Sequence, residues 1–191
     1  MMLALIKSFG KNKVRYAHAK SLYEQTRELS RTPEFYREYG VPDTFDGRFE
    51  ALVLHMYLLW ERLLIEGEAG ERLHQAIFDE MFVDMNQSLR AIGIGDLGVP
   101  KHIKRMMKAY KGRCFSYKHG IDGLHEAGKA NLLEEALRRN LFGTCDKTTE
   151  QKDIDFFVGY IEKQLNFLKT NTFDDIMAGK IQWLSVAEIK N

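Results

Sequence analysis

A short glycine motif is the first candidate for chemistry in this chain. Residues 93–98 read Gly-Ile-Gly-Asp-Leu-Gly, which matches the G-x-G-x-x-G pattern that cradles the pyrophosphate of dinucleotide cofactors. That function needs a β-strand before the glycines and a helix after them. The apolar residues before them recur instead at the three-four spacing of an amphipathic helix: Phe78, Met81, Phe82, Met85, Leu89 and Ile92. The sequence therefore predicts no dinucleotide site.

We interpret the motif as a joint between two helices. Gly93 stands where the first helix ends, because glycine readily adopts the left-handed conformation that closes a last turn. Pro100 stands where the second helix begins, because the first turn of a helix does not need the N–H that proline lacks. The residues predicted to fix this joint are Gly93, Gly95, Asp96 and Pro100.

Histidines near carboxylates are the candidates for metal chemistry. Glu71-x-x-His74 matches half of a di-iron bundle motif, which needs that pair twice together with two further glutamates. The nearest second pair, Asp122-x-x-His125, falls in a glycine-rich stretch, so we predict a solvated Glu71–His74 face and no metal site. His55 lies near the border of an apolar stripe, where we expect a partly buried histidine with a satisfied hydrogen bond; a haem or metal ligand is the alternative.

Nucleophilic catalysis finds no support in the sequence. It contains no G-x-S-x-G elbow or comparable nucleophile signature. Cys114 and Cys145 stand far apart and form no metal-binding spacing, so we predict unpaired thiols in a reducing compartment. We therefore expect a protein that is not an enzyme and that carries no cofactor.

Charge is balanced over the whole chain and uneven along it. The formal net charge is +1, which gives no general attraction to DNA or to anionic lipid. Acidic residues dominate between Glu66 and Asp96, and a basic run interleaved with methionine and aromatic residues follows: Lys101, Lys104, Arg105, Lys108, Lys111, Arg113 and Lys118. Such a helix suits a partner helix, a membrane surface or RNA, and it also describes an ordinary core helix with a lysine-rich exterior.

The elements that would position these residues are helices. Repeated three-four spacing predicts an all-α protein, a multi-helix globular bundle. Asp46 is the expected N-cap of the third helix, and an apolar segment from residue 172 onward is expected to dock on the bundle. The expected helices cover residues 13–29, 33–39, 47–64, 71–92, 100–117, 129–142 and 150–168, with a turn at 67–70 and a loose segment at 120–128.

We divide the chain into a helical core, residues 1–142, and a C-terminal helical extension that packs on it, residues 143–191. The longest apolar run, Ala51–Trp60, is half the length that a membrane span needs. No signal peptide is visible. We therefore expect a cytoplasmic protein, with peripheral contact at the inner face of the membrane left open.

Two blocks of sequence carry a resemblance to a known family. The first runs from Pro33-Glu34-Phe35-Tyr36 through Gly40-Val41-Pro42-Asp43-Thr44 and Gly47-Arg48-Phe49-Glu50 to the leucine-rich helix with His55. The second runs from Phe78-Asp79-Glu80-Met81-Phe82 through the glycine joint to Val99-Pro100-Lys101 and Gly112-Arg113. Over about residues 15–140 the chain resembles the ubiquinol–cytochrome c chaperone family. The matching polar and aromatic residues are Tyr36, Asp43, Arg48, Glu50, His55, Asp79, Asp84, Arg90, Lys101 and Arg113.

The resemblance implies an assembly factor that binds newly made cytochrome b during biogenesis of the cytochrome bc1 complex. It also implies a possible small partner protein and the ribosome as contacts, and the lack of a transit peptide favours a bacterial member. We expect a client groove between the helices that flank the joint, because methionine side chains adapt to varied apolar partners. Its expected lining is Phe82, Met85, Met106, Met107 and Tyr110, with Lys104 and Lys108 around it.

Two functions of other classes stay open at this point. One is a haem- or metal-binding helical protein that uses His55, His74 or His125. The other is an RNA- or ribosome-binding module that uses the basic run from Lys101 to Lys118.

Overall fold

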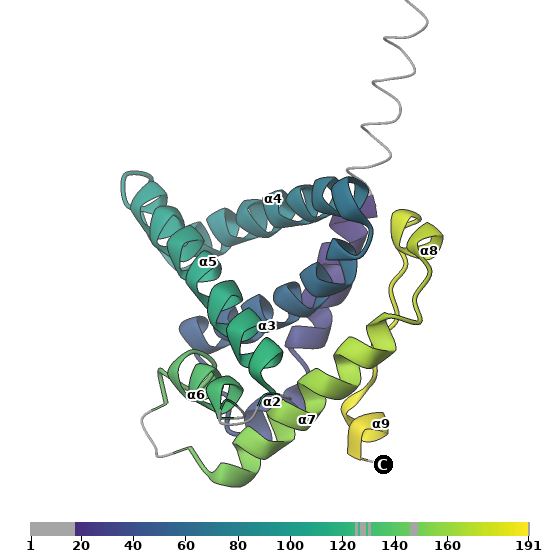
Figure 1. Cartoon of the computed structure of the whole chain (residues 1–191). Coiled ribbons are helices and arrows are strands. Elements are labelled where there is room, and N and C mark those ends of the chain that lie inside the picture. Colours follow the sequence, from purple (N-terminus) through teal and green to yellow (C-terminus); the bar gives the residue numbers. More distant parts are fainter. Residues whose placement is uncertain (1–17, 125, 127–128, 130, 146–148, 191) are drawn as a thin grey trace, which may run out of the picture.

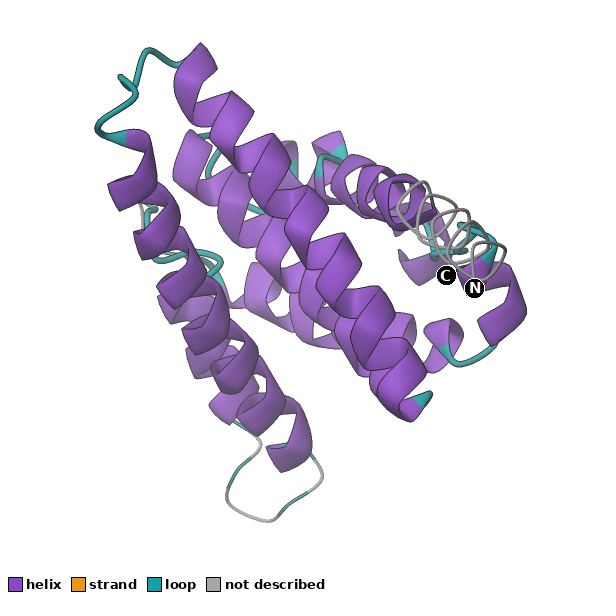
Figure 2. Cartoon of the chain, turned by 90° about the horizontal axis from the view of Figure 1, so that it is seen from above, coloured by secondary structure: helices purple, strands orange, loops and turns teal. Residues whose placement is uncertain are grey.

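The chain folds into a bundle of helices (Figures 1 and 2). The computed structural model describes residues 18–124, 126, 129, 131–145 and 149–190, and all regular secondary structure in them is helical, which confirms the all-α prediction. The first described helix, called here the N-terminal helix, covers residues 18–30; its expected start near residue 13 lies outside the described residues. The other helices are α2 (Pro33–Arg37), α3 (Phe45–Leu64), α4 (Gly67–Ala91), α5 (Val99–Gly123), α6 (Leu132–Arg139), α7 (Gln151–Leu168), α8 (Phe173–Met177) and α9 (Val186–Lys190).

α3 is the centre of the bundle. It packs against α4, α5 and α7, and Leu54 and Met56 on opposite sides of it are both fully buried, as expected of a helix that is apolar all round. Thr44 caps α3, because its hydroxyl accepts the backbone N–H of Gly47 at 3.0 Å. The expectation that Asp46 is the cap was wrong: Asp46 lies in the first turn, where a negative charge suits the helix dipole.

The turn between α3 and α4 is tighter than the sequence predicted. A turn was expected at residues 67–70, but α4 begins at Gly67, so only Ile65 and Glu66 separate the two helices. Gly70 allows this close approach, because a Cβ atom at that position would lie 1.9 Å from the carbonyl oxygen of Leu63. α3 and α4 therefore leave the turn in contact with each other.

The joint between α4 and α5 begins with a Schellman ending of α4. Gly93 has a φ of +90°, which glycine adopts without strain. Its N–H donates to the carbonyl oxygen of Arg90 at 3.0 Å, and the N–H of Ile94 donates to that of Leu89 at 3.1 Å. These two bonds satisfy the last carbonyl groups of α4, and the element directly before the glycines is therefore a helix and not the strand that a dinucleotide site needs.

A second set of contacts holds the loop of the joint. The carbonyl oxygen of Gly95 accepts the N–H of Gly98 at 2.8 Å. The carboxylate of Asp96 pairs with the guanidinium group of Arg90. Pro100 follows in the first turn of α5. The glycine motif at residues 93–98 is thus a joint between two helices, α4 and α5.

α5 is longer and α6 is shorter than the sequence predicted. α5 continues to Gly123 instead of ending near Tyr117, so the segment expected to be loose from residue 120 is helical at its start. Gly120 allows α6 to pack closely on α5, because a Cβ atom there would lie 2.7 Å from the Cα atom of Leu133. The extra turns of α5 are therefore stabilised by contact with α6.

The segment from residue 172 onward docks on the bundle. Its buried apolar side chains are Ile176, Ile181, Val186 and Ile189. On the N-terminal helix, Ser21 Oγ and Gln25 Nε2 both donate hydrogen bonds to the carbonyl oxygen of Gly179, at 3.0 and 2.8 Å. The segment therefore ties the N-terminal helix to the bundle, while the domain boundary at residue 142 stays a prediction. None of the described helices is both long and apolar enough to cross a membrane.

Candidate functional site

A cleft of about 610 Å³ lies between α3, α4 and α5. The helices around this cleft are arranged as Figure 1 shows: α4 and α5 diverge from the joint, and α3 crosses between them. We call this space the α3–α4–α5 cleft. Its lining residues are Trp60, Glu71, His74, Gln75, Phe78, Met107, Tyr110, Lys111 and Cys114. Most of these side chains are aromatic or sulfur-containing, so the cleft offers a largely apolar wall with a few polar atoms.

Aromatic rings packed edge to face form one wall of the cleft. The rings of Trp60 and His74 meet edge to face with centroids 3.6 Å apart, and those of Phe78 and Tyr110 with centroids 5.0 Å apart. A hydrogen bond of 3.0 Å joins His74 Nε2 to the Tyr110 hydroxyl group. One wall therefore contains side chains from three helices, which fixes the width of the cleft.

His74 is a buried neutral histidine rather than part of a solvated face. His74 is only 9% exposed, and burial lowers the pKa of its imidazole to about 3. Glu71 is exposed to solvent, as the sequence predicted. The same prediction was wrong for His74, which is buried. A neutral imidazole adds a ring and a hydrogen bond to the cleft, and it adds no charge there at neutral pH.

The two sulfur-containing side chains of the cleft differ in character. Met107 is 37% exposed at the opening, and its flexible thioether adapts to apolar surfaces of varied shape. Burial raises the pKa of the Cys114 thiol to about 12, so the thiol stays protonated and is a poor nucleophile. The arrangement is suited to holding an apolar ligand.

The predicted client-binding residues fall in three places. Met107 and Tyr110 line the α3–α4–α5 cleft, and Phe82 extends its aromatic wall by packing on Phe78 with ring centroids 4.7 Å apart. Met85 and Met106 lie in the core, 5% and 6% exposed. Lys104 and Lys108 are exposed on α5.

The position of the cleft differs from that of the expected groove. The groove was expected around the joint, but none of the joint residues lines the cleft. Sequence reasoning missed Trp60 and His74 as wall residues. The three-four spacing of Met107, Tyr110 and Cys114 marks one side of α5, but nothing in that spacing shows that Trp60 of α3 lies opposite.

An ion pair between a buried carboxylate and a half-buried guanidinium group fixes α5 against α3. Glu50 is 4% exposed, and its carboxylate accepts hydrogen bonds from Arg113 Nε at 2.9 Å and from Arg113 Nη2 at 2.7 Å. Burial raises the pKa of the Glu50 carboxyl group, and the hydrogen bonds from Arg113 oppose that shift. This two-pronged geometry is specific to a guanidinium–carboxylate pair.

A second tie joins α4 to the N-terminal helix. Asp84 accepts a hydrogen bond of 2.5 Å from the Tyr23 hydroxyl group and pairs with Arg27 at 3.1 Å. Burial, followed by the contacts with Asp84, raises the pKa of Tyr23. Asp84 thus fixes the position of α4, and through it one wall of the cleft.

The other residues that matched family motifs make local contacts. Arg48 pairs with Asp43 across the start of α3 at 2.6 Å, and the Tyr36 hydroxyl group donates to the carbonyl oxygen of Ser30 at 2.7 Å. Asp79 accepts a hydrogen bond from Gln75. Arg90 pairs in the joint, and Lys101 is exposed.

His55 is fully buried and uses both ring nitrogens inside the protein. Nδ1 donates to the carbonyl oxygen of Ala51 at 2.7 Å, so Nε2 accepts from the Tyr160 hydroxyl group at 2.7 Å. Burial lowers the pKa of His55 to about 4. The expected partly buried histidine is therefore wholly buried, with the expected satisfied hydrogen bonds. His125, the third histidine considered for a ligand, lies outside the described residues.

Comparison with known proteins identifies the family. The sequence model of the family described as ubiquinol-cytochrome C chaperone matches residues 37–183. The chain belongs to this family. The match includes α7 and most of the docked C-terminal segment, so the family pattern continues well past residue 140, where the sequence resemblance ended.

Relatives of the ubiquinol-cytochrome c chaperone family span animals, yeast and bacteria. Ubiquinol-cytochrome-c reductase complex assembly factor 1 of Xenopus laevis is 27% identical over 94% of this chain and 86% of its own length. Mitochondrial protein CBP3 of Saccharomyces cerevisiae is 26% identical over 86% of this chain and 49% of its own length. The chain covers 59% of the length of the Mus musculus assembly factor, so the longer relatives contain further sequence.

A crystal structure within the family shows the same fold. The Cbp3 homolog from Brucella abortus is 32% identical, with a TM-score of 0.79. The match covers 98% of this chain and 99% of the Brucella chain. This chain and the Brucella protein therefore share the fold in which the α3–α4–α5 cleft lies.

Proposed function

We propose that the chain is a non-enzymatic chaperone that assists assembly of the cytochrome bc1 complex by holding newly made cytochrome b. The supporting observation is the α3–α4–α5 cleft, an apolar cleft in a member of a family whose relatives are named as assembly factors. An apolar segment of a membrane subunit would otherwise be exposed to water before it reaches its partners. The cleft would cover such a segment and release it during assembly.

The chemistry of the cleft suits a client that is held and then released. Rings and thioethers bury apolar surface without requiring an exact sequence match. The neutral His74 and the Tyr110 hydroxyl group are already bonded to each other, so an apolar client need not leave an unpaired polar group behind. Lys111 at the opening leaves one positive charge at the edge of the cleft.

Site-specific photocrosslinking tests the proposal. A photoreactive residue in place of Met107, at the opening of the cleft, should crosslink to newly made cytochrome b. The same residue in place of Lys152, which is exposed at the start of α7 on another part of the surface, is the matched control. A folded Met107 variant that gives no more cytochrome b adduct than the Lys152 variant would sink the proposal.

We include in this proposal contacts of the chaperone with other parts of the cell. Binding of a small partner protein or of the ribosome, a cytoplasmic location and contact with the inner face of the membrane would all place the chaperone where cytochrome b emerges. Haem binding at His74 is the competing function, since its ring lines the cleft. The absorption spectrum of protein purified from haem-supplemented cells separates the two: a stoichiometric Soret band lost in His74→Phe would favour haem binding.

A further inference from the structure

One stripe of α5 collects lysines between two exposed apolar side chains. Positions at alternating intervals of four and three lie on one line along α5: Lys101, Lys104, Lys108, Lys111, Phe115 and Lys118. Leu97, which lies in the joint just before α5, precedes this line. We call this line the lysine stripe. Leu97 at one end is 98% exposed and Phe115 near the other is 76% exposed. Such exposure of two large apolar side chains costs solvation free energy in an isolated chain.

The charge of this region is almost entirely positive. Between residues 85 and 121 the sequence holds eight lysines and arginines and one acidic residue, Asp96, which Arg90 neutralises. Within the described part of the chain, the four lysines from Lys101 to Lys111 form no ion pair, whereas Lys118 pairs with Asp122. The stripe therefore presents a positive surface with no internal counter-charge along most of its length.

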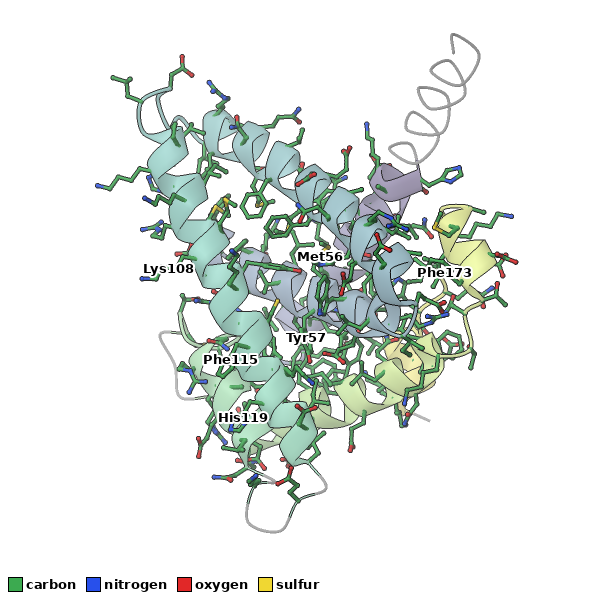
Figure 3. All side chains as sticks on the ribbon, turned by 45° about the horizontal axis from the view of Figure 1, so that its top comes forward. Met56, Tyr57, Lys108, Phe115, His119 and Phe173 are labelled. Atoms are coloured by element: carbon green, nitrogen blue, oxygen red, sulfur yellow. The ribbon has the colours of Figure 1, made fainter. Side chains whose placement is uncertain are left out.

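The lysine stripe lies beside the cleft and mostly outside it. Tyr110 and Cys114 point toward the cleft, while Figure 3 shows Lys108 extending from the side of α5 that faces away from Met56 and Tyr57 of α3. Lys111 belongs to both surfaces, since it also lines the cleft. A surface on which the stripe lay would therefore adjoin the opening of the cleft.

We propose that the lysine stripe docks this protein on an anionic lipid surface. The lysines would contact headgroup phosphates, and Leu97 and Phe115 would enter the interface between headgroups and acyl chains, as apolar residues of interfacial helices do. At 1.5 Å per residue, the stripe from Lys101 to Phe115 is about 21 Å long, and Leu97 lies in the joint just before it, so the helix would lie flat on the surface. RNA or an acidic protein would also attract the lysines; the lysines between two exposed apolar side chains favour the lipid interface, where charged and apolar groups are met side by side.

Vesicle flotation of the full chain tests this docking. The protein should float with vesicles that contain phosphatidylglycerol and remain unbound with phosphatidylcholine alone. The variant Lys104→Glu/Lys108→Glu should lower the partition coefficient at least tenfold, because one lysine near an anionic surface contributes about fivefold. Leu97→Ser/Phe115→Ser keeps every charge and should also lower it by about tenfold, because two interfacial apolar contacts are lost.

Two control variants match these changes elsewhere on the surface. Lys152→Glu/Lys169→Glu makes the same charge change at the two ends of α7, where both lysines are exposed, and Ile65→Ser removes a side chain that is 65% exposed at the opposite end of α4. Both controls should bind vesicles as the unaltered protein does. Circular dichroism checks that every variant keeps its helical content.

Three results would overturn the proposal. The first is that the protein floats equally well with neutral and with anionic vesicles. The second is that Lys104→Glu/Lys108→Glu and Lys152→Glu/Lys169→Glu lower the partition coefficient equally. The third is that Leu97→Ser/Phe115→Ser binds anionic vesicles as well as the unaltered protein does. The last would mean that the stripe acts through charge alone, as a contact for RNA or for an acidic protein does. Flotation requires no client and crosslinking from position 107 requires no vesicle, so failure of lipid docking is distinguishable from failure of the chaperone function.

Discussion

The carboxylate of Glu50 has lost nearly all contact with water, and the guanidinium group of Arg113 takes the place of the lost hydration. The Asp84 carboxylate on α4 is likewise bound by Tyr23 and Arg27 of the N-terminal helix. Removing one partner of such a pair leaves a buried group without its counter-charge. At the scale of residues, these matches to family motifs therefore hold the walls of the cleft, and they are engaged inside the protein rather than offered to a client.

The two buried histidines predict loss of stability in mild acid. Their pKa values are lowered to about 4 for His55 and about 3 for His74, below the value of about 6.5 for an unfolded chain. The unfolded state therefore binds more protons below about pH 6.5, and stability falls as pH falls. Between pH 7 and pH 5 each histidine should cost on the order of 2 kcal/mol.

Urea denaturation at the two pH values measures this effect. In His74→Phe the loss of unfolding free energy from pH 7 to pH 5 should be smaller than in the unaltered protein by about one histidine's share. The absolute stability of the variant does not matter, because only the difference between the two pH values is compared. Identical differences in the variant and the parent protein would contradict the assignment of His74 as a buried neutral group.

Residue types alone predicted part of this picture. Met107 and Tyr110 were predicted to bind the client because methionine and aromatic residues recur on one side of a basic helix; both line the cleft, and their contact with a client stays a prediction. Asp46 and Thr44 are both good N-caps by type, so the choice of Thr44 depends on the backbone path into α3. The burial of His74 depends on Trp60 and Tyr110, which come from two other helices, so no local pattern could reveal it.

At the scale of elements, two glycines of α5 have opposite roles. Gly120 faces α6, where a Cβ atom would lie 2.7 Å from backbone atoms of Leu133, and Gly112 faces open space. Gly120→Ala should therefore destabilise the protein by about 2 kcal/mol, since backbone must move to make room. Gly112→Ala should stabilise it by up to about 1 kcal/mol, since alanine favours a helix interior.

Thermal and urea denaturation of this pair of variants measures both effects on one helix. The substitution is the same in both variants, so the intrinsic helix preference of alanine cancels and the difference reports the contact between α5 and α6. Similar changes of stability for both variants would contradict the close packing of Gly120 on Leu133.

The period of apolar residues predicted most of the helices and not the angles between them. It placed α7 within one residue of its observed start, because a strongly amphipathic segment has a clear beginning and end. It ended α5 too early, because Gly120 and Gly123 favour a break in an isolated chain, and only the contact with α6 overrides that preference. The α3–α4–α5 cleft follows from how α4 and α5 diverge, which is a tertiary property.

At the scale of the whole molecule, the C-terminal segment is a structural part of the bundle. A chain that ends after Asn171 would lose four buried isoleucine and valine side chains: Ile176, Ile181, Val186 and Ile189. Each is worth about 1.5–3 kcal/mol when fully buried, and domains are stable by about 5–15 kcal/mol. The truncated chain should therefore be largely unfolded.

Far-ultraviolet circular dichroism and a urea titration of the truncated chain check this expectation. A chain that lacks only Asn191 is the control and should unfold as the full chain does. A cooperative transition of unchanged midpoint in the chain that ends after Asn171 would show that the docked segment adds nothing to the stability of the bundle.

The hydrogen bonds from Ser21 and Gln25 to Gly179 also set an order of events during synthesis. The N-terminal helix is made before its partner, since the carbonyl group that it binds is made more than 150 residues later. At about 5–20 residues per second, the helix waits roughly 8–30 s for its partner. Throughout translation its inward face, including Leu22 and Tyr23, lacks part of its final cover. During its synthesis this protein therefore exposes apolar surface of the N-terminal helix. The contacts of that helix with Gly179 form only after residue 179 has left the ribosome.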